Sequence, residues 1–179
     1  YTISLTSSLI YHLGEEGAEA VVAGWVANNP TYIDSDTRII ESVLAGECDL
    51  GVVNHYYLAR LISEDSEYPI RFFFPDQGEE GRGAFYNLSG AGITTAALNY
   101  DNAVLFLEFL SSLEVQNPGD TSFPTTNFEF PVHLEAIADP ILESFGEFKL
   151  DLTYPATEYK DYQQVALDLL ERAGYGMSE

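Results

Sequence analysis

Short apolar runs alternate along the chain with longer segments of helical periodicity, and glycine or proline separates most of them. The short runs predict strands at 50–53, 70–74 and 85–88. Helices are predicted over 4–13 and 15–28, from a cap at Asp34 or Ser35 to 45, from Asn54 to 62, over 103–113 and over 159–173. We expect the helix at 103–113 to be buried on most sides, because Glu108 is its only charge. This alternation predicts an α/β fold with mostly parallel sheets.

The chain is strongly acidic, with 29 Asp and Glu against 7 Lys and Arg and a formal net charge of -22. Nucleic acid is therefore excluded as a partner, because binding its phosphates needs clustered basic residues. The charge suits either a cationic ligand or a saline medium. A content of 13% aromatic residues excludes a disordered chain, and a single cysteine excludes an internal disulfide.

Two adjacent tyrosines, Tyr56 and Tyr57, follow Asn54 at a predicted passage from strand into helix. Parallel sheets bind ligands at such strand ends, and the first helical turn can direct both phenols toward one cleft. A phenol ionises near pH 10, so phenolate at neutral pH requires a strong Lewis acid, of which ferric iron is the natural candidate. Arg60 lies on the same helical face, where it could offset a surplus phenolate or hold an accompanying anion.

Other interpretations of these residues remain open. Tyr56 and Tyr57 could be half-buried aromatics, with Arg60 paired to Glu64. Cys48, Asp49 and His55 could form a nucleophilic site, although Cys48 would enter the strand from its far end.

Several segments resemble the ferric-iron-binding, substrate-capturing proteins of bacterial ABC uptake systems. The matching text runs in order as AGECD (45–49), VNHYYLARL (53–61), FPDQ (74–77), NLSGAG (87–92), Asp101-Asn102-Ala103, LEFLSS (107–112), FEFPV (128–132), FGEFK (145–149) and AGY (173–175).

The resemblance implies that Tyr56 and Tyr57 bind Fe(3+), and that Tyr1, about 55 residues upstream, is a third ligand. It also implies a synergistic anion such as carbonate, for which Arg60 is the candidate. The implied role is non-enzymatic: periplasmic capture of iron for an ABC permease in the inner membrane. The alternative is the same fold binding a small anion, with the tyrosines as hydrogen-bond donors.

The implied fold is the class II periplasmic-binding-protein fold, with mostly parallel sheets flanked by helices. Residues 1–84 would form the tyrosine-bearing lobe, 85–132 would return to the other lobe, and 133–179 would pack back on the first. Family members have a longer first part. We therefore expect this chain to be the C-terminal part of such a protein, with an incomplete two-lobed fold and a missing N-terminal lobe. An apolar patch at 85–88 and 103–113 should then be exposed.

Acidity beyond the needs of iron capture suggests a saline-adapted protein, so the melting temperature should rise with added salt. The carboxylates repel one another, and the Debye length is still about 8 Å at 0.15 M ionic strength. Thermal unfolding followed from low salt to about 2 M sodium chloride tests this screening effect. A melting temperature that fell steadily over that series would contradict it.

Overall fold

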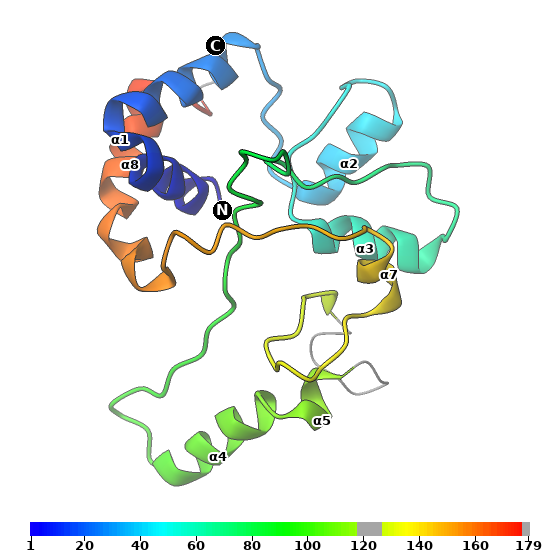
Figure 1. The fold of residues 1–179 in the computed structure, drawn as a ribbon, viewed down its shortest axis with the longest axis vertical. Coiled ribbons are helices and arrows are strands. Elements are labelled where there is room, and N and C mark those ends of the chain that lie inside the picture. Colours follow the sequence, from blue (N-terminus) through cyan, green and yellow to red (C-terminus); the bar gives the residue numbers. More distant parts are fainter. Residues whose placement is uncertain (118–126, 177–179) are drawn as a thin grey trace. The chain divides into compact units, whose positions relative to one another are not determined.

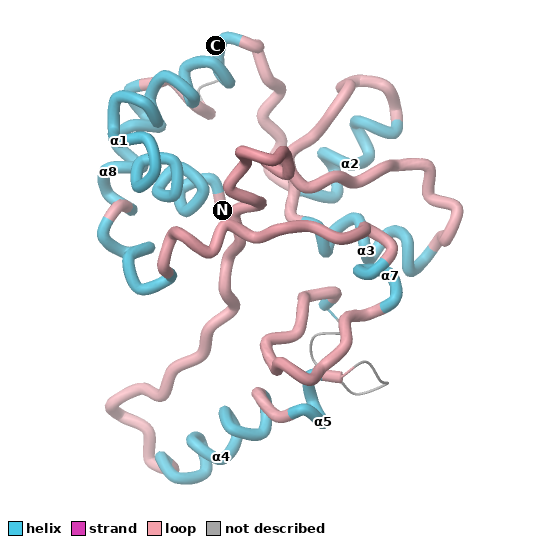
Figure 2. The backbone as a smooth tube through the Cα atoms, viewed as in Figure 1, coloured by secondary structure: helices cyan, strands magenta, loops and turns pink. Residues whose placement is uncertain are grey.

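The computed structural model describes residues 1–117 and 127–176 of the chain, which divides into two compact units. The first unit contains Tyr1–Ile33, Phe74–Ser89 and Phe148–Glu179. The second unit contains Asp34–Phe73 and Gly90–Glu147. Helices joined by loops make up the described part of both units (Figure 2). The predicted assignment of 1–84, 85–132 and 133–179 to lobes of a larger protein stays a prediction.

In its described residues the first unit contains the helical elements α1 (Thr2–Ala27), the 3-10 helix η1 (Ala156–Asp161) and α8 (Gln163–Arg172). At Gly14, α1 leaves helical geometry with φ 71° and ψ 170°, so it is two helical segments joined at a kink, as predicted. A left-handed φ favours glycine at this position. Gly174, also at positive φ, follows α8, which confirms the predicted end of that helix.

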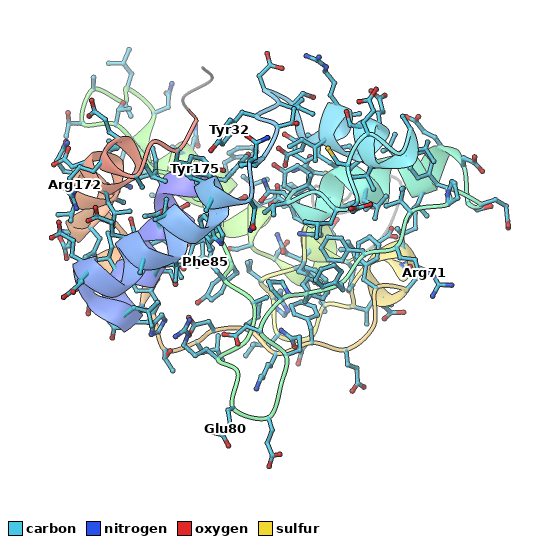
Figure 3. All side chains as sticks on the ribbon, turned by 90° about the horizontal axis from the view of Figure 1, so that it is seen from above. Tyr32, Arg71, Glu80, Phe85, Arg172 and Tyr175 are labelled. Carbon is cyan, nitrogen blue, oxygen red and sulfur yellow. The ribbon has the colours of Figure 1, made fainter. Side chains whose placement is uncertain are left out.

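The core of the first unit lies between α1 and α8, which run side by side (Figure 1). Its fully or nearly buried apolar side chains are Ile10, Ala18, Val22, Ala166, Leu169 and Leu170. The segment after α1 also contacts the segment after α8, since the ring centroids of Tyr32 and Tyr175 are 5.0 Å apart (Figure 3). On the surface, Arg172 of α8 donates to Glu15 and Glu19 of α1, both at 2.8 Å.

The first half of α1 buries polar side chains beside apolar ones. Leu13 is 42% exposed, whereas Thr6, Ser7 and Ser8 are buried. Ser7 Oγ donates to the carbonyl of Ile3 at 2.9 Å, which offsets the cost of burying its hydroxyl.

A short hydrogen bond crosses the first unit between α1 and the segment before η1. His12 Nε2 lies 2.6 Å from Asp151 Oδ2, and the two side chains are only 10% and 4% exposed. Asp151 Oδ1 also accepts hydrogen bonds from the backbone N–H and the hydroxyl of Thr153. Burial alone would raise the pKa of Asp151, but the bonds from Thr153 and His12 outweigh it and hold that pKa below its usual value.

The second unit contains α2 (Asp36–Leu44), α3 (His55–Glu64), α4 (Tyr100–Leu110), α5 (Leu113–Gln116) and α7 (Pro140–Glu143). Of the two predicted caps of α2, Ser35 is the one used, and its hydroxyl accepts from Arg38 N. Gly46, at φ +74°, follows α2 as predicted. No helix within 1–117 and 127–176 is long and apolar enough to cross a bilayer.

Helix α4 corrects one expectation and agrees with another. None of its residues is buried, so the prediction that it is covered on most sides is wrong. Leu105, Phe106 and Phe109 are each at least half exposed. This is the exposed apolar patch that was expected along this helix.

The predicted strands are not formed in the described residues. Among the described residues, sheet-type pairing is limited to one parallel bridge. In it, Ala84 N donates to the carbonyl of Lys149, and Asp151 N donates to the carbonyl of Ala84. The prediction of strands at 50–53, 70–74 and 85–88 is therefore wrong here. A strand needs a neighbour for its backbone groups, and without one Leu50 and Val52 lie in an exposed loop.

Asp151→Asn removes the buried charge and should lower the free energy of unfolding by about 1–3 kcal/mol at pH 7, because the hydrogen bonds from Thr153 and His12 would no longer be made to a charged acceptor. The pKa of Asp151 is depressed on folding, so its contribution is present above the unfolded value of about 3.9 and is lost as pH falls through the folded value. Urea unfolding of both proteins between pH 7 and pH 3 should show the difference narrowing. Asp49→Asn, at an exposed position, is the control and should be nearly neutral. A difference independent of pH would contradict the charge argument.

Candidate metal centre

The position of the tyrosine pair is set by the start of α3. Asn54 precedes the helix in an extended conformation, with φ −74° and ψ 139°, which agrees with its predicted N-cap position. Its side chain makes no capping bond. Instead, Asn54 donates to Asp36 Oδ2 twice, from its backbone N at 2.9 Å and from its side-chain Nδ2 at 3.1 Å. The beginning of α3 is thereby held against the first turn of α2.

Tyr56 and Tyr57 lie together in that first turn. Their ring centroids are 4.5 Å apart, the ring planes differ by 33°, and both side chains are half-buried. Neighbouring residues within a helix normally point about 100° apart, so this close pair depends on its place at the helix start. The two rings therefore lie together, but they follow a loop and not the predicted strand. That both phenols face one cleft stays a prediction.

Arg60 lies over both rings. Its guanidinium carbon is 5.2 Å from the Tyr56 centroid and 5.3 Å from the Tyr57 centroid, within the range of cation–π attraction. The guanidinium donates to the side-chain oxygen of Asn127 rather than to Glu64. A single positive charge is thus held beside two potential phenolates.

His55, the first residue of α3, contacts both the tyrosine pair and a distant segment. Its ring meets that of Tyr56 edge-on at 5.7 Å, and its Nε2 is 2.9 Å from the carbonyl oxygen of Phe128. A carbonyl can only accept, so Nε2 carries the proton and donates this bond. Burial lowers the pKa of His55, which keeps the ring neutral at pH 7.

Tyr1, the third predicted ligand, belongs to the first unit, whereas Tyr56 and Tyr57 belong to the second. Tyr1 directly precedes α1, and its carbonyl accepts from Leu5 N and from the hydroxyl of Ser4. Its side chain is 68% exposed. Its participation in a shared site stays a prediction.

Sequence reasoning missed the contacts of Asn127, Phe128 and Glu129 with this region. These residues follow the tyrosines by about 70 positions, so no local spacing could indicate the contact. The available signal was the FEFPV segment, which contributes to the resemblance without revealing a role.

The alternative nucleophilic site gains no support from contacts. Cys48 is a half-buried free thiol, and the recorded hydrogen bond of the His55 side chain goes to a backbone carbonyl. Among the residues that the structure describes, no three His, Cys, Asp or Glu side chains form a group that could hold a metal.

Comparisons with known proteins extend over nearly the whole chain. Iron uptake protein A1 of Synechocystis is 39% identical in a 160-residue alignment that covers 86% of this chain and 43% of that protein. The Fe(3+)-binding periplasmic protein of Serratia marcescens is 27% identical over 78% of this chain and 40% of its own length. The solved structure of the Trichodesmium protein IdiA (FutA) in complex with iron and citrate superposes with a TM-score of 0.86 and 36% identity, covering 98% of this chain and 55% of that one.

The chain is homologous to the ferric-iron-binding periplasmic proteins. It spans about half the length of these relatives. The solved relatives have the class II periplasmic-binding-protein fold, so the predicted fold class is confirmed as an incomplete version of it. No protein-family model matches the chain.

Two tyrosines of the first unit lie in surroundings that disfavour ionisation. Tyr154 is almost fully buried, and Tyr159 donates from its hydroxyl to the carbonyl of Tyr86 at 3.0 Å. Desolvation by burial raises the pKa of each to about 12. These phenols resist the ionisation that binding to a metal requires.

Titration of phenolate absorbance should therefore show Tyr154 and Tyr159 ionising near pH 12, while the chain is still folded or as it unfolds. Tyr159→Phe should remove amplitude from this last step only and should cost about 1 kcal/mol of stability through the lost hydrogen bond. The control is Tyr100→Phe, at an exposed position on α4, which should leave the last step intact. Loss of amplitude near pH 10 in Tyr159→Phe would refute the raised pKa.

Proposed function

We propose that this chain is part of a ferric-iron-binding protein of an ABC uptake system, and that Tyr56 and Tyr57 bind the iron as phenolates. The observation that carries the proposal is the pair of rings 4.5 Å apart at the first turn of α3, with Arg60 over both. The names of the relatives, which include an Fe(3+)-binding periplasmic protein, support iron as the cargo.

The chemistry of the pair favours a trivalent ion. Two adjacent phenols would both have to lose a proton at neutral pH, about three units below their usual pKa. A small trivalent cation makes this possible, because it attracts each phenolate oxygen far more strongly than a monovalent cation does. The one positive charge of Arg60 offsets part of the negative charge that two phenolates would bring.

Tyr1 and Arg60 complete the proposed site. Tyr1 would supply a third phenolate, which leaves the remaining positions of a ferric coordination shell to other groups. The guanidinium of Arg60 has five N–H donors and could hold a synergistic anion such as carbonate as well as Asn127. The solved Trichodesmium relative contains citrate with its iron, which supports an accompanying anion of some kind.

The proposed role of the whole protein is capture of ferric iron in the periplasm and delivery to an ABC permease in the inner membrane, without catalysis. The net charge of -22 would also attract cations to the surface of the chain. An alternative function, binding of a small anion with the tyrosines as hydrogen-bond donors, is favoured only by the position of Arg60 over the rings.

Ferric iron added to the protein expressed from its whole gene should produce a visible phenolate-to-iron charge-transfer band. Tyr56→Phe and Tyr57→Phe should each shift this band and weaken binding at least tenfold, because each removes a hard anionic ligand from a trivalent ion. Affinity is measured by competition with a chelator of known strength, and the band by absorbance.

Tyr100→Phe serves as the matched control, since Tyr100 is exposed on α4 of the same unit, and it should leave band and affinity unchanged. An unchanged spectrum in both Tyr56→Phe and Tyr57→Phe would refute direct ligation. Anion binding without any ferric band, weakened by the same variants, would establish the alternative function.

A further inference from the structure

Three consecutive residues, Asn127, Phe128 and Glu129, reach the first turns of α3 from a distant part of the chain. Asn127 accepts a hydrogen bond from Arg60 through its side-chain oxygen and donates one to Glu129 through its side-chain nitrogen. Phe128 accepts from His55 through its backbone carbonyl. We name residues 127–129 the brace.

The backbone of the brace adopts a conformation that is rare for its residue type. Phe128 has φ +54°, in the left-handed region, where a bulky side chain costs on the order of 1–3 kcal/mol. Such a conformation persists only where surrounding contacts hold it. Here the carbonyl of Phe128 bonds to His55 at 2.9 Å, while Phe130 packs its ring 5.1 Å from the ring of the same histidine.

The brace also restrains an otherwise mobile charge. Arg60 is exposed, and an arginine side chain in water retains about 2 kcal/mol of rotamer entropy. The bond to Asn127 limits this freedom, and the bond between Asn127 and Glu129 limits the rotation of the amide in turn. The guanidinium is held where it faces both tyrosine rings.

We propose that Asn127 and Glu129 are positioning residues for the iron ligands: by holding Arg60 over Tyr56 and Tyr57, they set the geometry and charge of the tyrosine pair. In this proposal Asn127 acts directly on Arg60, and Glu129 acts through Asn127. The proposal rests on the proposed function for its effect on iron, but the effect on the rings is independent of any metal.

The test is Asn127→Ala in the protein expressed from its whole gene, with Asn102→Ala as the control. Asn102→Ala is the same substitution at an exposed position of α4. In Asn127→Ala, ferric affinity should fall about tenfold and the charge-transfer band should move. Asn127→Asp keeps an oxygen that can accept from Arg60 but loses the donor to Glu129, so it should restore only part of the affinity, which a merely structural role would not explain.

The metal-free protein provides the second measurement. Rings 4.5 Å apart shift each other's proton resonances, so Asn127→Ala should change the ring-proton shifts of Tyr56 and Tyr57, and Asn102→Ala should not. Unchanged ring shifts together with wild-type iron binding in Asn127→Ala would overturn the proposal and leave the proposed function intact. If the wild type forms no ferric band, the proposed function fails, and the ring shifts alone decide whether the brace positions the pair.

Discussion

The carboxylate of Asp36 determines where the tyrosine pair lies, because it accepts two hydrogen bonds from Asn54 at the start of α3. One bond uses the backbone of Asn54 and the other its side chain, so both the position and the orientation of the helix start are held. Tyr56 and Tyr57 follow within a single turn, the part of a helix where adjacent side chains can be brought together. The arrangement of the candidate metal centre therefore depends on a contact between two helices outside it.

Two kinds of tyrosine in this chain illustrate how environment selects chemistry. Tyr154 and Tyr159 are in the first unit, where burial and aromatic neighbours raise the pKa of each to about 12 and suit them to packing. Tyr56 and Tyr57 are half-buried beneath a guanidinium, where negative charge on the phenol oxygens would be compensated. The residue type is the same, but desolvation disfavours the anion of Tyr154 and Tyr159, whereas Tyr56 and Tyr57 lie beside a guanidinium.

Local signals predicted much of the secondary structure. The kink at Gly14, the cap at Ser35 and the turn at Gly46 all follow from residue types whose conformational preferences act within a few positions. Local signals do not determine strands in the same way, since a strand forms only if a second segment pairs with it. The exposed face of α4 has a similar cause, because an apolar pattern indicates that a helix can be covered but not which segment covers it.

The amino-acid sequence by itself determined that this protein is acidic, α/β in pattern and related in its motifs to ferric-iron-binding proteins, and it singled out Tyr56, Tyr57 and Arg60. These features depend on composition and on residues close together in the chain. Only the tertiary structure decided that Arg60 bonds to Asn127 rather than Glu64, and that the carbonyl of Phe128 faces His55. Both contacts join residues about 70 positions apart, and such pairs are selected by the packing of the folded chain, which no local preference encodes.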